Sequence, residues 1–199
     1  MKIRIIGYAG SGKTSLTIRL QEKYRIQGIA LDDYLKIRDK NQRYNQLSER
    51  LQKLSNWIVE GVQVSRWTEK STSDADLIII LDYPLSLCQY RVTKRAITQC
   101  FQKTKTFAQR KKIIKRMFKL YKWNRRFKKR LPDIKQNLYM DHGKLLILES
   151  PKDEKRIHRE IKSDRSKLSN NNRKKAARNE KFLAVFLFKS PLKLAYHSL

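Results

Sequence analysis

The chain has 199 residues, with 47 Lys and Arg against 18 Asp and Glu and a formal net charge of +29. That length allows one domain of ordinary size with a short appendage. No apolar run approaches the ~20 residues that span a bilayer. Cys88 and Cys100 are too few for a disulfide framework and lack zinc-ligand spacing. Residues 1–6 run directly into a glycine-rich loop and do not resemble a targeting signal. We therefore expect a cytoplasmic protein without membrane contact.

The positive charge is concentrated in one segment. Residues 94–135 hold 17 Lys and Arg against a single acid, Asp133, whereas residues 1–93 hold 15 against ten acids. Residues 163–199 are also basic, and we expect them to form a tail of uncertain order outside a domain of residues 1–162. A basic insert can be a solvated helical face, or an anion site for nucleotide phosphates or a nucleic-acid backbone. Composition does not choose between these.

The predicted elements alternate between strands and helices. Because the strands are almost continuously apolar rather than alternating, they indicate a parallel sheet covered by helices on both faces, an α/β fold. In chain order, apolar runs and helical spacing predict a strand at 2–6, a helix at 13–24, a strand at 27–31, a helix at 44–54, strands at 56–61 and 77–81, helices at 85–100 and 107–129, a strand at 144–148 and a helix at 151–161.

A glycine-rich loop follows the first predicted strand. Residues 7–14, Gly-Tyr-Ala-Gly-Ser-Gly-Lys-Thr, match the phosphate-binding motif G-x-x-x-x-G-K-[ST] of P-loop NTPases. Its glycines let backbone N–H groups turn toward a phosphate, and the helix N-terminus adds partial positive charge. We expect Lys13 to reach the β- and γ-phosphates of ATP and the Thr14 hydroxyl to ligate Mg²⁺. The expected nucleotide contacts are Gly7, Gly10, Ser11, Gly12, Lys13, Thr14 and Ser15.

Carboxylates at the ends of the predicted strands are candidates for metal binding and catalysis, because ligands bind at the carboxyl ends of parallel strands. Asp82 closes an aliphatic strand and is expected to hold Mg²⁺ together with Thr14; alternatively, it caps the next helix. Asp32 or Asp33 could accept a proton from a substrate hydroxyl or ligate Mg²⁺ through water, or could form an ordinary acidic turn. Glu60 could support the metal, bind the acceptor, or pair with a nearby Lys or Arg.

Two arginines lie in the helix predicted for 85–100. Arg91 and Arg95 are four residues apart and therefore share one helix face. Arginines aimed at a γ-phosphate stabilise the charge that phosphoryl transfer spreads over its oxygens; the alternative is a pair of surface arginines. The basic segment beyond them, about 94–135, is expected to form a helical lid that keeps water away from the nucleotide.

Aromatic residues are interleaved with this basic run. Such a pattern would suit base stacking combined with backbone contact to a nucleic acid. We expect the aromatic side chains to form the apolar face of the lid helices instead. They are Phe101, Phe107, Phe118, Tyr121, Trp123 and Phe127.

A set of landmarks follows in order over residues 1–162. They are the loop 7–14, Leu31-Asp32, Asn-Trp-Ile-Val-Glu-Gly at 56–61, the segment 74–84, Cys88, Arg91, Arg95, the segment 130–134 and the segment 144–151. This ordered set resembles the small P-loop proteins described as DNA topology modulation or FlaR-related proteins, within the adenylate-kinase-like group. That resemblance implies ATP binding and a nucleoside- or nucleotide-kinase-like fold. Asp32-Asp33-Tyr34 is also similar to the Asp-Asp-Phe element of uridine-kinase-like enzymes, which implies an Asp base near the acceptor.

Three functions follow as hypotheses. The first is a small-molecule kinase that transfers the γ-phosphoryl group of Mg·ATP to an acceptor that the sequence does not identify. The second is a nucleic-acid-binding protein that uses residues 94–135 and the tail and in which ATP acts as a switch. The third is a plain NTPase or an inactive nucleotide-binding fold.

Overall fold

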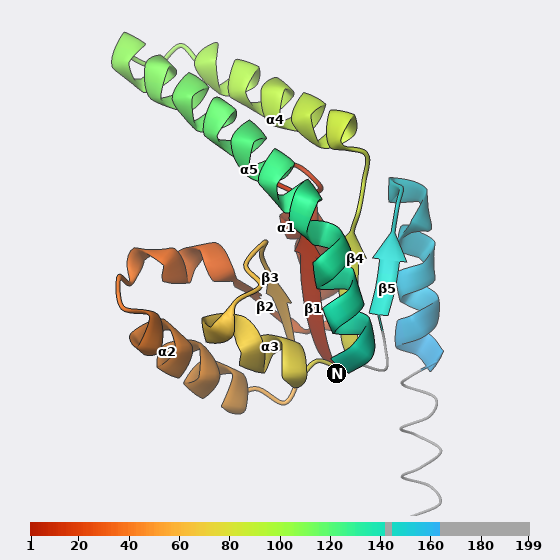
Figure 1. Cartoon of the computed structure of the whole chain (residues 1–199). Helices are drawn as coiled ribbons and strands as arrows, with labels where there is room; N and C mark the ends of the chain where they lie inside the picture. Colours follow the sequence, from red (N-terminus) through yellow and green to blue (C-terminus); the bar gives the residue numbers. More distant parts are fainter. Residues whose placement is uncertain (142–144, 164–199) are drawn as a thin grey trace, which may run out of the picture. The chain divides into compact units, whose positions relative to one another are not determined.

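The structure is a computed structural model that describes residues 1–141 and 145–163 (Figure 1). Except for Ser163, the predicted basic tail at 163–199 lies outside the described residues. No helix in the described part is long and apolar enough to cross a membrane. The elements are β1 (Lys2–Gly7), α1 (Lys13–Tyr24), β2 (Gln27–Ala30), the 3₁₀ helix η1 (Leu31–Lys36), α2 (Lys40–Gln52), β3 (Trp57–Glu60), η2 (Arg66–Thr68), α3 (Glu69–Ser73), β4 (Leu77–Leu81), α4 (Leu85–Cys100), α5 (Phe107–Asp141), β5 (Leu145–Leu148) and η3 (Pro151–Asp153).

The chain divides into two compact units, Met1–Asp153 and Glu154–Leu199. The first contains every strand found among the described residues. The described part of the second is helical over residues 154–163. The domain boundary expected at 162 stays a prediction.

The five strands form one parallel sheet in the order β2-β3-β1-β4-β5. Successive residues of a strand point to opposite faces, and every residue of β3 and β4 is buried, so both faces of the central strands are covered. Helix α1 packs on β1, β2 and β3, and Figure 1 draws it behind the sheet with α5 in front. The predicted α/β fold with a parallel sheet is confirmed.

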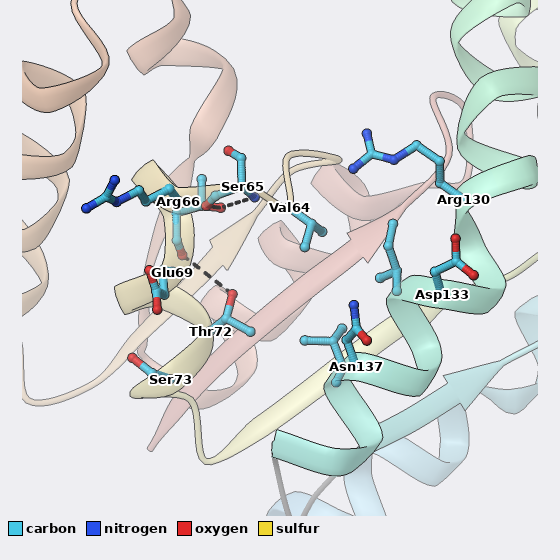
Figure 2. A pocket seen from close by; sticks show the side chains of 12 residues that line it. Val64, Ser65, Arg66, Glu69, Thr72, Ser73, Arg130, Asp133 and Asn137 are labelled. Atoms are coloured by element: carbon cyan, nitrogen blue, oxygen red, sulfur yellow. Dashed lines mark hydrogen bonds between the residues drawn. The ribbon is translucent and has the colours of Figure 1, made fainter.

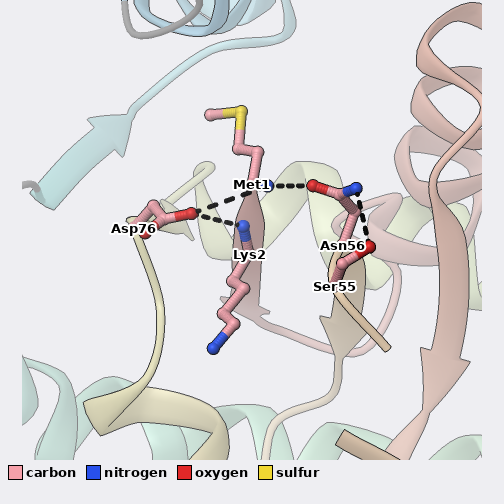
Figure 3. A network of polar contacts seen from close by, with 5 residues as sticks. All are labelled: Met1, Lys2, Ser55, Asn56 and Asp76. Carbon is pink, nitrogen blue, oxygen red and sulfur yellow. Dashed lines mark hydrogen bonds and ion pairs between the residues drawn. The ribbon is translucent and has the colours of Figure 1, made fainter. Parts of the chain in front are cut away.

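The amino-terminal end of β1 is held by polar contacts between neighbouring segments (Figure 3). The Lys2 backbone N–H donates to Asp76 Oδ2 at 2.7 Å. The Met1 amino group lies 3.8 Å from the same carboxylate oxygen and also donates to Asn56 Oδ1. These bonds tie β1 to the segments that lead into β3 and β4. They lie at the sheet edge opposite the glycine-rich loop, which follows the other end of β1.

Helix α5 is longer than predicted. The expected helix ended at 129, whereas the observed one continues through Pro132 to Asp141. Proline inside a helix removes a backbone hydrogen bond and disfavours the turn before it. A stripe of buried side chains at helical spacing explains why the helix persists, since tertiary packing supplies most helix stability in proteins. The stripe consists of Phe127, Leu131, Ile134 and Leu138.

The predicted lid at 94–135 is two regions with different surroundings. We call residues 124–138 of α5 the anchor segment, because its buried stripe belongs to the core. We call residues 94–123 the outer hairpin; it joins the end of α4 to the first part of α5, which pack against each other (Figure 1). The expectation that the aromatic side chains form an inward apolar face holds for Phe127. It is wrong for Phe101, Phe107 and Phe118, which are 81%, 83% and 60% exposed.

Candidate functional site

The glycine-rich loop adopts a backbone that only glycine accepts at two positions. Gly10 and Gly12 have φ of 85° and 96°, a left-handed region that L side chains rarely adopt. A Cβ atom on Gly10 would also lie 2.4 Å from the carbonyl oxygen of Cys88 in α4. Backbone conformation and packing against α4 therefore both require glycine at position 10.

Several backbone N–H groups of this loop lack acceptors among the described residues. They belong to Gly10, Gly12, Lys13 and Thr14, at the start of α1; the first helical bond there runs from Leu16 to Gly12. Adjacent unpaired amides at a helix N-terminus bind anions, because the donors and the helix dipole act in the same direction. The loop therefore has the donor set that a nucleotide phosphate requires.

Lys13 lies folded over this loop. Its Nζ donates to the carbonyl oxygens of Gly7 at 3.1 Å and Tyr8 at 2.8 Å. Burial lowers the pKa of the Lys13 ammonium, and the nearby carboxylates of Glu60 and Asp32 oppose that shift. The cation is thus placed at the loop with two carboxylates in its electrostatic neighbourhood.

The Thr14 hydroxyl is joined to a different carboxylate from the one that the sequence suggested. Thr14 Oγ1 donates to Glu60 Oε1 at 2.8 Å. Glu60 is buried at the end of β3, which pairs with β1. A hydroxyl beside a carboxylate suits Mg²⁺, which is usually held by one or two carboxylates together with substrate phosphates and water. The described residues contain no cluster of three or more His, Cys, Asp or Glu that would hold a metal alone.

Asp82 has other partners. Its Oδ2 lies 2.5 Å from Lys135 Nζ of the anchor segment, and its Oδ1 accepts a bond from the Tyr8 hydroxyl at 3.4 Å. Burial, followed by the charge of Asp82, raises the pKa of the Tyr8 phenol, so Tyr8 remains a donor. Asp82 therefore links β4, the loop and α5. Its predicted metal role stays a prediction, and the geometry favours Glu60 in its place.

The two acidic residues after β2 differ in their contacts. Asp32 Oδ1 accepts a hydrogen bond from Gln63 Nε2 at 2.8 Å, and its charge acts on Lys13. Asp33 is exposed in the same 3₁₀ helix. Of the pair, only Asp32 is connected to the loop residues by a contact or a charge interaction among the described residues.

The two predicted arginines also lie in different surroundings. Arg91 Nη1 donates to the Ser11 carbonyl oxygen at 3.2 Å, and its guanidinium lies 5.8 Å from the centroid of the Tyr83 ring. Arg95 is exposed one turn further along α4, where it lines a cavity of about 210 Å³ between α4 and α5. The structure thus brings Arg91, but not Arg95, to the loop. Ser15, also a predicted contact, is exposed at the start of α1.

Asn124 is a site residue that sequence reasoning missed. It is buried at the start of the anchor segment, where its Oδ1 accepts from the Ala9 N–H and its Nδ2 donates to the Ala9 carbonyl, both at 2.9 Å. This amide pairs with both backbone groups of one loop residue across 115 positions of sequence. The available signal was an uncharged polar residue within a strongly basic stretch, at helical spacing from Phe127.

Arg4 is the second missed residue. Its guanidinium is fully buried and donates to the carbonyl oxygens of Ile5, Val59 and Gln63. Burial lowers the pKa of Arg4 to about 9, and the charge of Glu60 opposes that shift. Arg4 therefore holds the segment after β3, which carries Gln63, against β1. The signal was a cation in the middle of the isoleucine run 3–6.

No family model matches the chain, and no curated protein matches it. Three similar solved structures are those of kinases. Shikimate kinase from Bacteroides thetaiotaomicron is 16% identical with a TM-score of 0.45, over 85% of this chain and 98% of that one. Deoxyadenosine kinase from M. mycoides with bound dATP is 16% identical with a TM-score of 0.49, over 81% and 100%. Shikimate kinase from Acinetobacter baumannii in complex with shikimate is 14% identical with a TM-score of 0.39, over 68% and 93%. The α/β P-loop fold is established by the chain's own parallel sheet and loop.

Proposed function

We propose that the protein is a kinase that transfers the γ-phosphoryl group of Mg·ATP to a small molecule. The observation that carries the proposal is the convergence of three features at one edge of the sheet. Lys13 belongs to the loop whose backbone amides are unpaired, the Thr14 hydroxyl donates to the Glu60 carboxylate at 2.8 Å, and Asp32 acts electrostatically on Lys13. These are, in order, a phosphate site, a metal-ligand pair and a group that can hold an acceptor hydroxyl.

Each residue has a distinct role in this proposal. Lys13 neutralises charge on the β- and γ-phosphates, and Arg91, held at the loop by its bond to Ser11, adds a second cation. Thr14 and Glu60 would hold Mg²⁺, which supplies charge neutralisation on the phosphate oxygens. Asp33 and Arg95 have no role in this proposal, because no contact among the described residues connects either of them to the loop.

In the proposed transfer, one bond to phosphorus forms, one breaks, and one proton moves. The acceptor oxygen forms a new bond to the γ-phosphorus while the bond from that phosphorus to the oxygen of the leaving ADP breaks and its electron pair stays with ADP. The proton of the acceptor hydroxyl passes to Asp32, whose carboxylate is fixed in place by Gln63. Asp32 then returns the proton to solvent.

The test is ATP turnover with Mg²⁺ against a panel of nucleosides, nucleotides, sugars and hydroxy acids. We expect one acceptor class to stimulate turnover, and Lys13→Ala to reduce the stimulated rate about a hundredfold or more, by analogy with the loss of one preorganised donor. Lys23→Ala, an exposed lysine on the same helix, is the matched control and should leave the rate unchanged. Turnover that is independent of every acceptor would indicate a plain NTPase, and equal rates in both variants would refute the assignment of Lys13.

A second candidate function, nucleic-acid binding of the DNA topology modulation type, is favoured by a separate observation. The outer hairpin holds 11 Lys and Arg with no acid, and Phe101, Phe107 and Phe118 are exposed along it. Exposed aromatic rings among cations suit stacking on single-stranded bases. A salt titration of single-stranded and duplex binding tests it: uniform loss at modest salt without preference for either would mean only a sticky surface.

A further inference from the structure

We infer that the phosphoryl acceptor carries an anionic group, a phosphate or a carboxylate, and that Arg126 and Arg130 of α5 bind it. This inference rests on the proposed kinase function and adds the substrate class. It starts from a cavity that the sequence did not indicate, between the anchor segment and the loop that follows β3. Arg126, Arg130 and this cavity were not part of the expected site.

The cavity has a volume of about 340 Å³, within the size range of small-molecule sites. The loop 62–65 and Leu35 of η1 form one side. Trp123, Arg126, Phe127 and Arg130 of α5 form the other. The cavity is therefore an open groove lined by segments that follow two neighbouring strands and by α5, and Arg126 and Arg130 are exposed at it.

Two contacts place this cavity next to the proposed catalytic residues. Gln63, one of its lining residues, donates to Asp32 at 2.8 Å. Phe127, on the opposite wall, packs edge-on against Tyr8 of the glycine-rich loop, with ring centroids 5.0 Å apart. A molecule in the cavity would thus lie beside Gln63, which contacts Asp32, and beside Phe127, which contacts the loop.

The charge of the lining residues indicates which class of acceptor the cavity would bind. Arg126 and Arg130 are one helical turn apart and lie on one face, and both line the cavity. The nine described residues that line it include no acid, and neither guanidinium has an ion pair with the described residues. Two unneutralised, fork-shaped donors recognise phosphate or carboxylate.

A second, larger cavity of about 570 Å³ shares Val64, Ser65 and Arg130 with the first. Figure 2 shows Arg130 extending from α5 toward the segment that carries Val64 and Ser65, whereas Arg66 points away from α5. Asp133 and Glu69 line this second cavity. Its acids make it the less suitable of the two for an anion, so the anionic group is assigned to the first.

Apart from the arginines, much of the cavity lining is apolar and would contact the body of the acceptor. Leu35, Val62, Val64, Phe127 and Trp123 supply them. Trp123 is 39% exposed, with Lys119 Nζ at 5.6 Å from the ring centroid. The surroundings thus suit a partly apolar body with an anionic group at the arginines and a hydroxyl on the side of Gln63, which contacts Asp32.

The experiment compares matched acceptors with and without the anionic group, at about physiological salt so that distant charges are screened. Nucleoside 5′-monophosphates are paired with nucleosides, and cyclic hydroxy acids with their methyl esters; the two pairs distinguish phosphate from carboxylate. Arg126→Gln and Arg130→Gln should each raise the acceptor KM at least tenfold with the KM for ATP unchanged. Arg125→Gln, an exposed neighbour that does not line the cavity, should change neither.

The outcomes separate this inference from the proposed function. Stimulation by neutral acceptors equal to that by anionic ones, unchanged in the arginine variants, would overturn the inference and leave the kinase intact. If no compound stimulates turnover, the kinase proposal fails and with it the assignment of an acceptor, and calorimetric binding of the same anionic compounds then decides whether Arg126 and Arg130 form an anion site. Binding that weakens in Arg126→Gln and Arg130→Gln but not in Arg125→Gln supports it, whereas no binding, or equal binding in all three, refutes it.

Discussion

In helix α5, the anchor segment and the part that belongs to the outer hairpin lie in one continuous element with the same basic composition. The anchor segment buries Asn124 and four apolar side chains against the core, and also contributes Lys135 to the Asp82 pair. In the outer part, Ile114 and Phe118 are exposed. The charge pattern does not distinguish the two regions; the apolar spacing and the neighbouring sheet do. A basic segment therefore cannot be assigned one role from its charge alone.

The largest expected effect separates the two regions by stability. Leu131→Ala removes a buried side chain of the anchor segment and should lower the free energy of unfolding by about 2–5 kcal/mol. Ile114→Ala, on the outer part of the same helix, should change it by no more than about 0.5 kcal/mol, as an exposed substitution. Denaturant unfolding of both variants measures this. Equal losses would mean that the two parts of α5 contribute alike to the core.

A smaller effect is expected where the anchor segment holds the glycine-rich loop. Asn124→Ala leaves the Ala9 N–H and carbonyl without their partners and should cost about 1–3 kcal/mol of unfolding free energy. It should also weaken ATP binding, because the loop amides lose their support. Asn137→Ala, exposed on the same helix, is the control in both thermal unfolding and calorimetric titration. Unchanged ATP affinity in Asn124→Ala would limit Asn124 to a structural role.

The smallest effect on stability is expected in the outer hairpin. Replacing Phe101, Phe107 and Phe118 together with Ser should leave the unfolding midpoint almost unchanged, since all three rings are exposed. If the phenylalanine rings stack on bases, the binding free energy for single-stranded nucleic acid should fall by about 1–3 kcal/mol for each base that loses its stacking partner. ATP turnover should stay the same. Fluorescence anisotropy with a labelled oligonucleotide measures the affinity. Unaltered binding would leave only the electrostatic attraction of the lysines and arginines.

Much of the site could be predicted because the responsible signals are local. The spacing of Gly7, Gly10, Gly12, Lys13 and Thr14 describes a loop whose backbone conformation depends on the glycines themselves. Aliphatic runs such as 77–81 predict buried parallel strands, and the parallel sheet confirms them. By contrast, the partner of the Thr14 hydroxyl could not be derived, since both Glu60 and Asp82 end a strand next to β1 and only packing selects between them.

By itself, the sequence determined the P-loop, the α/β class and the presence of a strongly basic helical segment, because each depends on residue type at short spacing. The tertiary structure decided which parts of that segment are core and which are surface, that Asn124 supports Ala9, and that Arg126 and Arg130 face a cavity beside Gln63. These contacts join residues far apart in sequence. They arise from how a long helix crosses the sheet edge, which no local pattern encodes.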